Sequence, residues 1–264
     1  MYPILFSLGK IKIYSYGFMV ALTLLLGIIW VGRAAEKRKL ATFDQIIDFA
    51  FYVIIGGLLF AKILHIIIEF DLFIKEPKAL FTGSAGSFFG GVIGGFLFGV
   101  YYTKKKKIPT WELADVIAQY IPLGHILGRV GCLLSGCCYG VPTDVPWALR
   151  CSPDHILRHP TQIYEMIGNL LIFIILWQIR KHAEEKGKTY FPGFIFWLYI
   201  GLYAINRTIT EFTRESQIMA FGWLRTTQFF CFLTMIVVFP YIAYKFKNQK
   251  KMEKEVNASS SINS

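Results

Sequence analysis

Charged side chains are scarce in this sequence. They make up 17% of its 264 residues, whereas about 25% is usual in soluble domains. Hydrophobic residues make up 55%. A chain with so little charge has too few polar side chains to cover a soluble surface, so the composition is typical of an integral membrane protein.

Three further features are missing. The first apolar run is followed by a basic cluster that starts at Arg33, with no small-residue cleavage site, so we do not expect a removable signal peptide. There is no internal repeat, and an inverted-repeat transporter therefore has no support. The basic clusters that give the net charge of +11 follow apolar runs and form no polar face with interleaved aromatic residues, which excludes nucleic acid as the expected partner.

The apolar residues gather in runs of about the 20 residues that a helix needs to cross a bilayer. These runs are residues 15–32, 46–68, 84–102, 112–134, 163–180, 190–210 and 221–244. Basic clusters follow every second run, starting with the first, so the positive-inside rule places the N-terminus outside and the C-terminus in the cytoplasm. The sequence thus predicts an all-α integral membrane protein with about seven transmembrane helices in a single domain, 1–248. A polar, disordered cytoplasmic tail, 249–264, is expected to follow.

The end of the fourth apolar run holds the most unusual combination of residues. From Gly128 to Gly140 the sequence reads GRVGCLLSGCCYG. A guanidinium such as that of Arg129 is costly at membrane depth unless it pairs with another group or contacts a ligand. The glycines beside it let a second backbone or a ligand approach closely. We therefore expect the chemistry of the protein here.

A second polar group lies in the sixth run, where Tyr203, Arg207, Glu211 and Arg214 are spaced to share one helical face. These charges could merely satisfy one another. They could also leave one guanidinium to bind an anionic headgroup, because arginine binds phosphate with two parallel hydrogen bonds. We favour the second hypothesis because Arg129 is expected at a similar depth.

Two more segments are unusual for membrane spans. Paired glycines recur between residues 83 and 95, where close helix packing is favoured over contact with a lipid headgroup. Residues 159–165 read HPTQIYE and lead into the fifth run. They indicate either a hydrogen-bonded collar around a site or an ordinary helix cap.

These motifs together resemble those of the prolipoprotein diacylglyceryl transferases, and the resemblance covers about residues 10–245. The run from Gly128 to Gly140 is similar to the family signature Gly-Arg-Ile-Gly-Asn-Phe-x-Asn-Gly-Glu-x-x-Gly. Residues 159–165 resemble the family's His-Pro-Ser-Gln-Leu-Tyr-Glu, and residues 89–95 its His-Gly-Gly-Leu-Ile-Gly-Gly. The face from Tyr203 to Arg214 matches a fourth family motif, in the same order along the chain.

The resemblance implies an enzyme of the bacterial cytoplasmic (inner) membrane whose active site faces outward. Such an enzyme moves the diacylglyceryl group of phosphatidylglycerol onto the lipobox cysteine of a prolipoprotein and needs no cofactor or metal. Its expected catalytic residues are Arg129, Arg207 and Tyr203. Its expected substrate-binding residues are Tyr16, Gly90, Gly91, Gly94, Cys132, Gly140, Glu211 and Arg214.

The sequence departs from the family pattern at several polar positions. Phe89 stands where the family commonly has histidine, and Cys132, Ser135 and Cys137 replace Asn, Asn and Glu of the signature. The alternatives are therefore a paralogue with another acceptor or lipid, and a membrane protein that binds or transports phospholipid without chemistry. His125 could supply the missing imidazole or could be a packing residue.

Four of the five cysteines, Cys132, Cys137, Cys138 and Cys151, lie within about twenty residues of one another. Disulfides that tie the outer loop are the first interpretation, because disulfides form on the outer side of the membrane. Inert packing residues, a zinc site and a transiently acylated thiol are the others. Zinc is not favoured because the Cys-x4-Cys-Cys spacing lacks the usual two-plus-two pattern.

Overall fold

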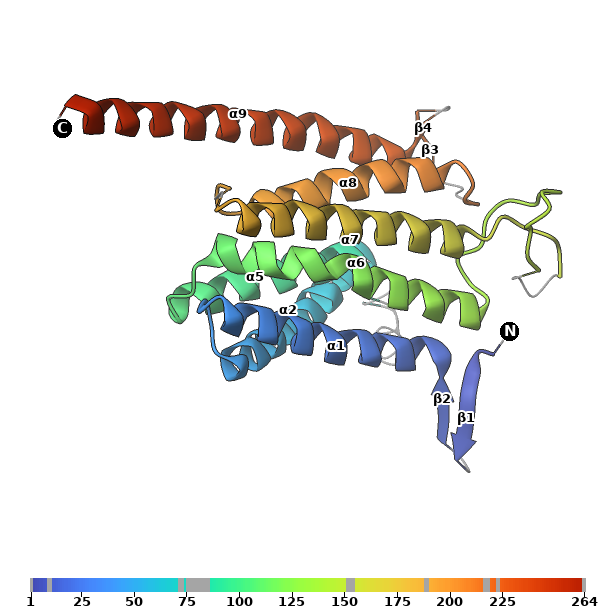
Figure 1. Ribbon diagram of the computed structural model, residues 1–264. Coiled ribbons are helices and arrows are strands. Elements are labelled where there is room, and N and C mark those ends of the chain that lie inside the picture. The colour runs from blue at the N-terminus through green and yellow to red at the C-terminus, as the bar shows by residue number, and fades with distance from the viewer. Residues whose placement is uncertain are drawn as a thin grey trace. The chain divides into compact units, whose positions relative to one another are not determined.

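The computed structural model describes residues 2–8, 11–70, 74, 86–150, 155–187, 190–215, 219–221 and 224–262. Within these residues the chain forms seven named helices and two small antiparallel sheets (Figure 1). The elements are β1 Ile4–Leu8, β2 Ile11–Tyr14, α1 Ser15–Lys37, α2 Phe43–Ile68, α5 Phe88–Lys105, α6 Thr110–Ser135, α7 Thr161–Glu185, α8 Phe194–Glu211, β3 Met219–Phe221, β4 Leu224–Arg225 and α9 Thr226–Ile262.

The helices coincide with the seven predicted apolar runs, so the predicted all-helical architecture is confirmed. Five of the described helices, α1, α2, α6, α7 and α9, are long and apolar enough to cross a membrane. The count of seven spans and their orientation stay predictions. Helix α9 extends to Ile262 and includes most of the segment that we expected to be a disordered tail. The division into a membrane domain and a tail stays a prediction too.

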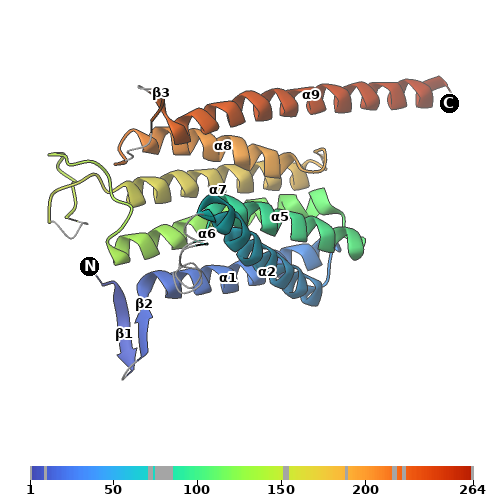
Figure 2. The ribbon, with the colours of Figure 1, turned by 180° about the vertical axis from the view of Figure 1, so that it is seen from behind.

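The described chain divides into two compact units. The larger unit comprises Met1–Gly27 and Ala114–Ser264, and in it α6, α7, α8 and α9 lie side by side in that order (Figures 1 and 2). Its core is apolar, and these helices contribute Ala118, Ile172, Leu176, Phe194, Ile195, Tyr199, Val238 and Ile242. This core holds the helices in register, so that polar residues at one end of α6, α7 and α8 face one another.

A carboxylate fixes the start of α8 in the larger unit. The first N–H groups of a helix have no partner within it, and two of them here donate to Asp115 of α6. Gly193 N lies 2.8 Å from one carboxylate oxygen and Phe196 N lies 2.9 Å from the other. Gly193 has a φ of 91°, a conformation that glycine adopts without strain. The contact ties α8 to α6 at the end opposite to Arg129.

The hairpin of β1 and β2 attaches the N-terminus to the end of α6. Tyr2 N donates to Leu134 O at 3.0 Å, and Ser15 N donates to Pro3 O at 3.0 Å. The first turn of α1 therefore starts beside the glycines that follow Arg129. A methyl group on Gly131 would lie 3.4 Å from the Cα of Tyr16, so the two backbones approach closely.

The smaller unit comprises Ile28–Leu113 and is built on the contact between α2 and α5. Thr42 and Gln45 form a capping box at the start of α2, and Ser87 caps α5. A methyl group on Gly90 would overlap the carbonyl oxygen of Phe60, and one on Gly94 would overlap that of Gly56. The predicted close helix packing is confirmed for these glycines. Residues 83–85 of the glycine-rich segment lie outside the described residues.

Replacing Gly94 with alanine is expected to destabilise the smaller unit, because the added methyl group would meet the backbone of α2 and force the helices apart. We expect a lower midpoint of thermal unfolding in detergent. Gly95→Ala is the matched control, because its methyl group finds ordinary contact at 3.4 Å and alanine favours a helix by about 1 kcal/mol over glycine. An equal or greater loss in the control would contradict the packing argument.

Candidate functional site

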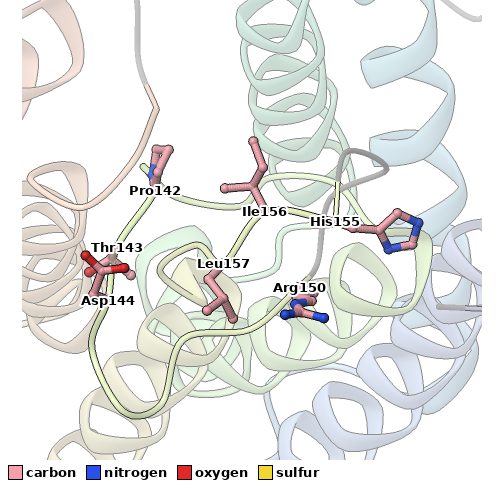
Figure 3. Close-up of a pocket in the computed structure, with 7 residues that line it drawn as sticks. All are labelled: Pro142, Thr143, Asp144, Arg150, His155, Ile156 and Leu157. Atoms are coloured by element: carbon pink, nitrogen blue, oxygen red, sulfur yellow. The ribbon is translucent and has the colours of Figure 1, made fainter.

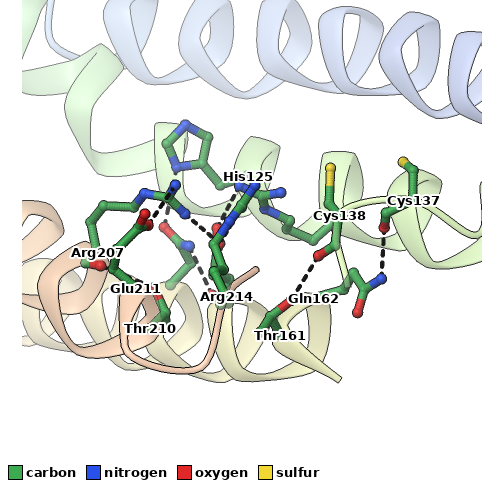
Figure 4. Close-up of polar contacts among 12 residues, drawn as sticks. His125, Cys137, Cys138, Thr161, Gln162, Arg207, Thr210, Glu211 and Arg214 are labelled. Atoms are coloured by element: carbon green, nitrogen blue, oxygen red, sulfur yellow. Dashed lines mark hydrogen bonds and ion pairs between the residues drawn. The ribbon is translucent and has the colours of Figure 1, made fainter. Parts of the chain in front are cut away.

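The centre of the site is the carboxylate of Glu165, which three arginines contact. Arg129 Nη2 lies 2.6 Å from Oε2, while Arg207 Nη1 and Arg214 Nη1 lie 2.7 and 3.2 Å from Oε1. Arg207 Nη2 also lies 3.0 Å from Oε2 of Glu211, although without hydrogen-bond alignment. Figure 4 shows Arg207, Glu211 and Arg214 gathered in this cluster. The predicted convergence of Arg129 with the arginines near the end of α8 is thus confirmed.

The charges in the cluster do not balance. Three guanidinium groups face two carboxylates, which leaves one net positive charge. The Glu165 and Glu211 side chains are 3% and 1% exposed, whereas the three arginine side chains are 16–21% exposed. The buried acids hold the arginines in place while the arginines remain accessible. The surplus charge is therefore presented to whatever enters the site, and an anion is favoured.

The spacing from Tyr203 to Arg214 predicted that these residues share one helical face. The structure shows a different arrangement for Arg214. Helix α8 ends at Glu211, and Arg214 lies three residues beyond that end. Its backbone pairs with Gly140 as an isolated β-bridge. The single-face prediction is wrong for Arg214, because the turn after α8 redirects its side chain to Glu165 on α7. Arg225 stabilises that turn: its Nη1 donates to the carbonyl oxygens of Glu211 and, at 2.8 Å, Arg214.

The motif at residues 159–165 forms a collar. The N-cap residue of α7 is Pro160, whose side chain makes no capping hydrogen bond, so the helix-cap interpretation is wrong. His159 Nδ1 lies 3.1 Å from the hydroxyl of Tyr164, to which Trp147 Nε1 donates at 2.6 Å. Thr161 and Gln162, both fully buried, donate to the loop that follows α6. The motif thus connects the loop, α7 and the arginine cluster.

The loop after α6 brings three cysteines together. Gly136 and Cys138 have φ values of 69° and 62°, and this left-handed turn reverses the chain after the helix. Thr161 Oγ1 donates to Cys138 O and Gln162 Nε2 to Cys137 O, each at 2.7 Å (Figure 4). The sulfur atoms of Cys132, Cys137 and Cys138 lie within 4.8 Å of one another.

All three are free thiols, so the disulfide interpretation is wrong for this group. Cys151 lies outside the described residues. A hydrogen bond with the thiol of Cys132 lowers the pKa of Cys138, and the positive charges of Arg129 and Arg214 act in the same direction. Cys138 therefore gives up its proton more readily than an ordinary cysteine.

The aromatic residues predicted for the site lie beside the arginine cluster in the larger unit. The ring of Tyr203 lies 4.9 Å from that of His125, centroid to centroid. His125 Nδ1 lies 3.3 Å from Asn169 Oδ1 and 3.5 Å from the hydroxyl of Tyr199. These contacts favour the interpretation of His125 as a packing residue. Tyr16, which is 49% exposed, stands at the start of α1 next to Gly131.

The predicted glycines lie in the loop after α6 and in α5. Gly140 is enclosed by protein, since a methyl group there would come within 2.8 Å of both His159 Cβ and Thr161 Cγ2. The structure thus accounts for the glycine by packing of the loop, and its contact with a substrate stays a prediction. Gly90, Gly91 and Gly94 belong to α5 in the smaller unit. Their predicted contact with a substrate also stays a prediction.

A cavity of about 380 Å³ lies in the loop between α6 and α7 (Figure 3). Its lining residues are Pro142, Thr143, Asp144, Arg150, His155, Ile156 and Leu157. The arginines that contact Glu165 are not among them. We assign the cavity no part in the site.

The sequence-based site omitted Glu165, Arg225 and Gln162. Glu165 ends the motif at 159–165, and its position in a membrane span was the signal that could have identified it as the partner of the arginines. No local pattern marks Arg225, because it acts on carbonyl oxygens of another segment. Gln162 belongs to the same motif, for which a hydrogen-bonded collar was one hypothesis, and its contact with the cysteine loop gives it a specific role.

Taken together, the larger unit presents surplus positive charge next to three thiols. Guanidinium groups bind phosphate through paired charge-assisted hydrogen bonds, and they stabilise negative charge that develops on a leaving phosphate. The adjacent sulfur atoms can act as nucleophiles or as ligands of a soft metal ion. The arrangement suits chemistry on a phosphate ester that involves a thiol.

Comparison with known proteins gives a consistent result. Residues 3–244 match the family model described as prolipoprotein diacylglyceryl transferase. The chain is 36% identical over 257 residues to a phosphatidylglycerol–prolipoprotein diacylglyceryl transferase from Clostridium tetani, covering 94% of this chain and 100% of that one. It is 31% identical over 261 residues to a protein of the same name from Dehalococcoides mccartyi, covering 96% of each chain. A relative from Geobacter sulfurreducens is 35% identical over 219 residues, covering 81% of this chain and 82% of the other.

Proposed function

This chain belongs to the prolipoprotein diacylglyceryl transferase family, and on that premise we propose that it transfers the diacylglyceryl group of phosphatidylglycerol to the lipobox cysteine of a prolipoprotein. The observation that carries the proposal is the set of three partly exposed arginines held on one buried glutamate. It provides a site for an anionic headgroup beside the part of the chain that resembles the family signature.

In this reaction the acceptor thiol loses its proton, and its sulfur attacks the glyceryl carbon that is bonded to the phosphate oxygen. The carbon–sulfur bond of a thioether forms as the carbon–oxygen bond breaks. The electron pair of that bond leaves with the oxygen of glycerol phosphate. Negative charge grows on the departing phosphate, and guanidinium groups fixed beforehand stabilise it without having to reorganise. The surplus charge of the arginine cluster suits this step.

We assign roles to the residues of the cluster by their contacts. Arg129 and Arg207 hold the phosphate, and Glu165, Glu211 and Arg214 fix the directions of their guanidinium groups. Tyr203 and Tyr16 position the headgroup.

The location of the protein follows from the proposed acceptor. Prolipoproteins are secreted, so we place the site on the outer side of the bacterial cytoplasmic membrane, and the positive-inside rule predicts the N-terminus on that side too. The apolar helices and the alternating basic clusters support a multi-pass membrane protein with this orientation. Phosphatidylglycerol then reaches the arginines laterally from the bilayer.

The decisive experiment incubates the purified full-length protein with phosphatidylglycerol and a lipobox peptide, and detects the thioether product by mass spectrometry. A peptide with serine in place of the cysteine is the control for transfer to sulfur. Formation of diacylglyceryl peptide is the expected result. Binding of phosphatidylglycerol without product, while a family member is active alongside, would instead indicate a lipid-binding protein.

A further inference from the structure

The loop after α6 contains a feature that the proposed reaction does not explain. Three free thiols, on Cys132, Cys137 and Cys138, converge in a chain whose other described cysteine, Cys231, lies on α9. Cys132 is buried in the last turns of α6, and the other two are half-buried in the following turn. Their sulfur atoms lie within 4.8 Å of one another. Around a tetrahedral zinc ion, with bonds of about 2.3 Å, neighbouring sulfurs are about 3.8 Å apart.

The backbone holds these thiols together. Cys137 N donates to Cys132 O at 3.1 Å, which closes the turn against the end of the helix. The carbonyl groups of Cys137 and Cys138 point toward α7, where Gln162 and Thr161 bind them. Figure 4 shows the two sulfur atoms on the side of the loop away from these carbonyls. The thiols of the turn therefore point to one side, and the hydrogen bonds to its carbonyl groups on the other side hold the turn in place.

The chain provides three ligands, and this number has a chemical meaning. Structural zinc sites are closed by four protein ligands, whereas catalytic sites have three and leave the fourth position to water or substrate. Three thiolates around Zn²⁺ give a net charge of −1, and the neighbouring arginine cluster has one net positive charge.

The position of the thiols relative to Arg129 favours a role in the reaction. Cys132 follows Arg129 by three residues on α6, and side chains with this spacing are neighbours on a helix surface. A sulfur nucleophile at the cysteines would thus lie close to a phosphate held by the arginines. The reaction must also remove a proton from the acceptor thiol, and the contacts of His125 with Asn169 and Tyr199 favour a packing role for that imidazole.

We propose that Cys132, Cys137 and Cys138 bind a soft divalent cation, Zn²⁺, whose fourth position takes the thiol of the acceptor cysteine. This inference rests on the proposed function and names the group that activates its nucleophile. It replaces the expectation of no metal, which came from the family resemblance and from the spacing of the cysteines.

The chemistry balances without another reactant. A thiol that coordinates zinc is deprotonated outright, and its proton passes to water. The coordinated sulfur then donates an electron pair to the glyceryl carbon, and the carbon–oxygen bond breaks in favour of the phosphate. The thioether product is neutral and a weaker ligand than the thiolate, so it leaves the metal and reopens the fourth position.

The first test measures metal binding and requires no turnover. The reduced full-length protein in detergent micelles is freed of metal with a chelator and titrated with Co²⁺ as a spectroscopic probe. We expect one Co²⁺ per chain, with the thiolate charge-transfer absorption and intense visible bands of four-coordinate cobalt, and displacement by Zn²⁺. A reduced protein that develops no thiolate absorption would overturn the proposal, whatever its variants do.

Cysteine variants locate the site. Cys132→Ser, Cys137→Ser and Cys138→Ser are each expected to weaken Co²⁺ binding by at least about tenfold. Cys231→Ser is the matched control and should bind as the unmutated protein does. Size-exclusion chromatography and thermal unfolding establish that each variant is folded. Unchanged binding in folded variants of all three cysteines would also overturn the proposal.

The second test concerns the role of the metal. A lipobox peptide should shift the spectrum of the Co²⁺-loaded protein, and its serine analogue should not. Turnover should fall on chelation and return with Zn²⁺. If metal-free protein turned over substrate at the normal rate, the metal would have no role in the reaction and the proposal would be overturned. The proposed transferase function would still stand. If the metal-loaded protein showed no turnover, the proposed function would be contradicted. The peptide-induced spectral shift would still show whether the acceptor thiol occupies the fourth coordination position of the metal.

Discussion

Replacing Arg129 with lysine is expected to lower turnover by about 10²- to 10³-fold, the usual cost of removing one fixed donor to a developing oxyanion. Lysine keeps the positive charge but loses the planar fork that binds phosphate and carboxylate with two hydrogen bonds. Arg129 contacts Glu165 through Nη2 at 2.6 Å, and a guanidinium has further N–H donors on its other nitrogens. The loss should therefore fall mainly on kcat, measured as the rate of thioether formation at saturating phosphatidylglycerol.

The matched control is Arg33→Lys, which changes an exposed arginine of α1 in the smaller unit. Its turnover should equal that of the unmutated protein. The assignment of Arg129 would be wrong if Arg129→Lys retained full kcat, or if both variants lost activity to the same extent. A rise in KM with unchanged kcat would mean that Arg129 binds the headgroup equally in the ground state and the transition state, and its assignment to the developing charge would then be wrong.

Replacing Glu165 with glutamine is expected to destabilise the protein by about 3–5 kcal/mol, because removing one partner of a buried ion pair leaves the others uncompensated. Without this carboxylate, Arg129, Arg207 and Arg214 would face one another with only Glu211 to balance them. We expect a lower midpoint of thermal unfolding in detergent, together with loss of turnover. Glutamine has nearly the volume of glutamate, so a packing defect does not explain the effect.

Glu185→Gln on the same helix is the control. Glu185 is 60% exposed and pairs with Lys181 at 3.8 Å, and such surface pairs contribute little. Its removal should change stability by no more than about 0.5 kcal/mol. If Glu165→Gln unfolded at the same temperature as this control, the three ion pairs with Glu165 would not contribute to the stability of the protein, which would contradict the prediction.

Much of the fold could be predicted from the sequence because helix formation in a membrane is a local property. A run of apolar residues must satisfy its own backbone hydrogen bonds in lipid, so each run identifies a helix before its neighbours are known. The seven runs and the seven named helices of the described residues agree for this reason. Close helix packing at Gly90 and Gly94 could be anticipated too, because glycines at helical spacing are a local sign of it.

The site was predictable only in part. Arg129 and Arg207 could be singled out because a charged side chain in an apolar run is costly unless it pairs with another group or contacts a ligand. Their contact with one carboxylate confirms that they are paired. Arg214 was assigned to the wrong arrangement, since no pattern in the sequence shows that α8 ends before it. The disulfide hypothesis failed for Cys132, Cys137 and Cys138 because proximity in sequence does not fix the direction of a thiol.

The sequence by itself determined that this protein is helical and apolar and that Arg129 and Arg207 interrupt apolar runs, since these are properties of composition and local periodicity. Only the tertiary structure decided that arginines from α6, from α8 and from the turn after α8 meet on Glu165 of α7. Only the tertiary structure brought the three thiols of one turn within reach of a single ion. Both outcomes depend on how helices far apart in the chain pack together, and that packing is fixed by burial and shape over the whole larger unit.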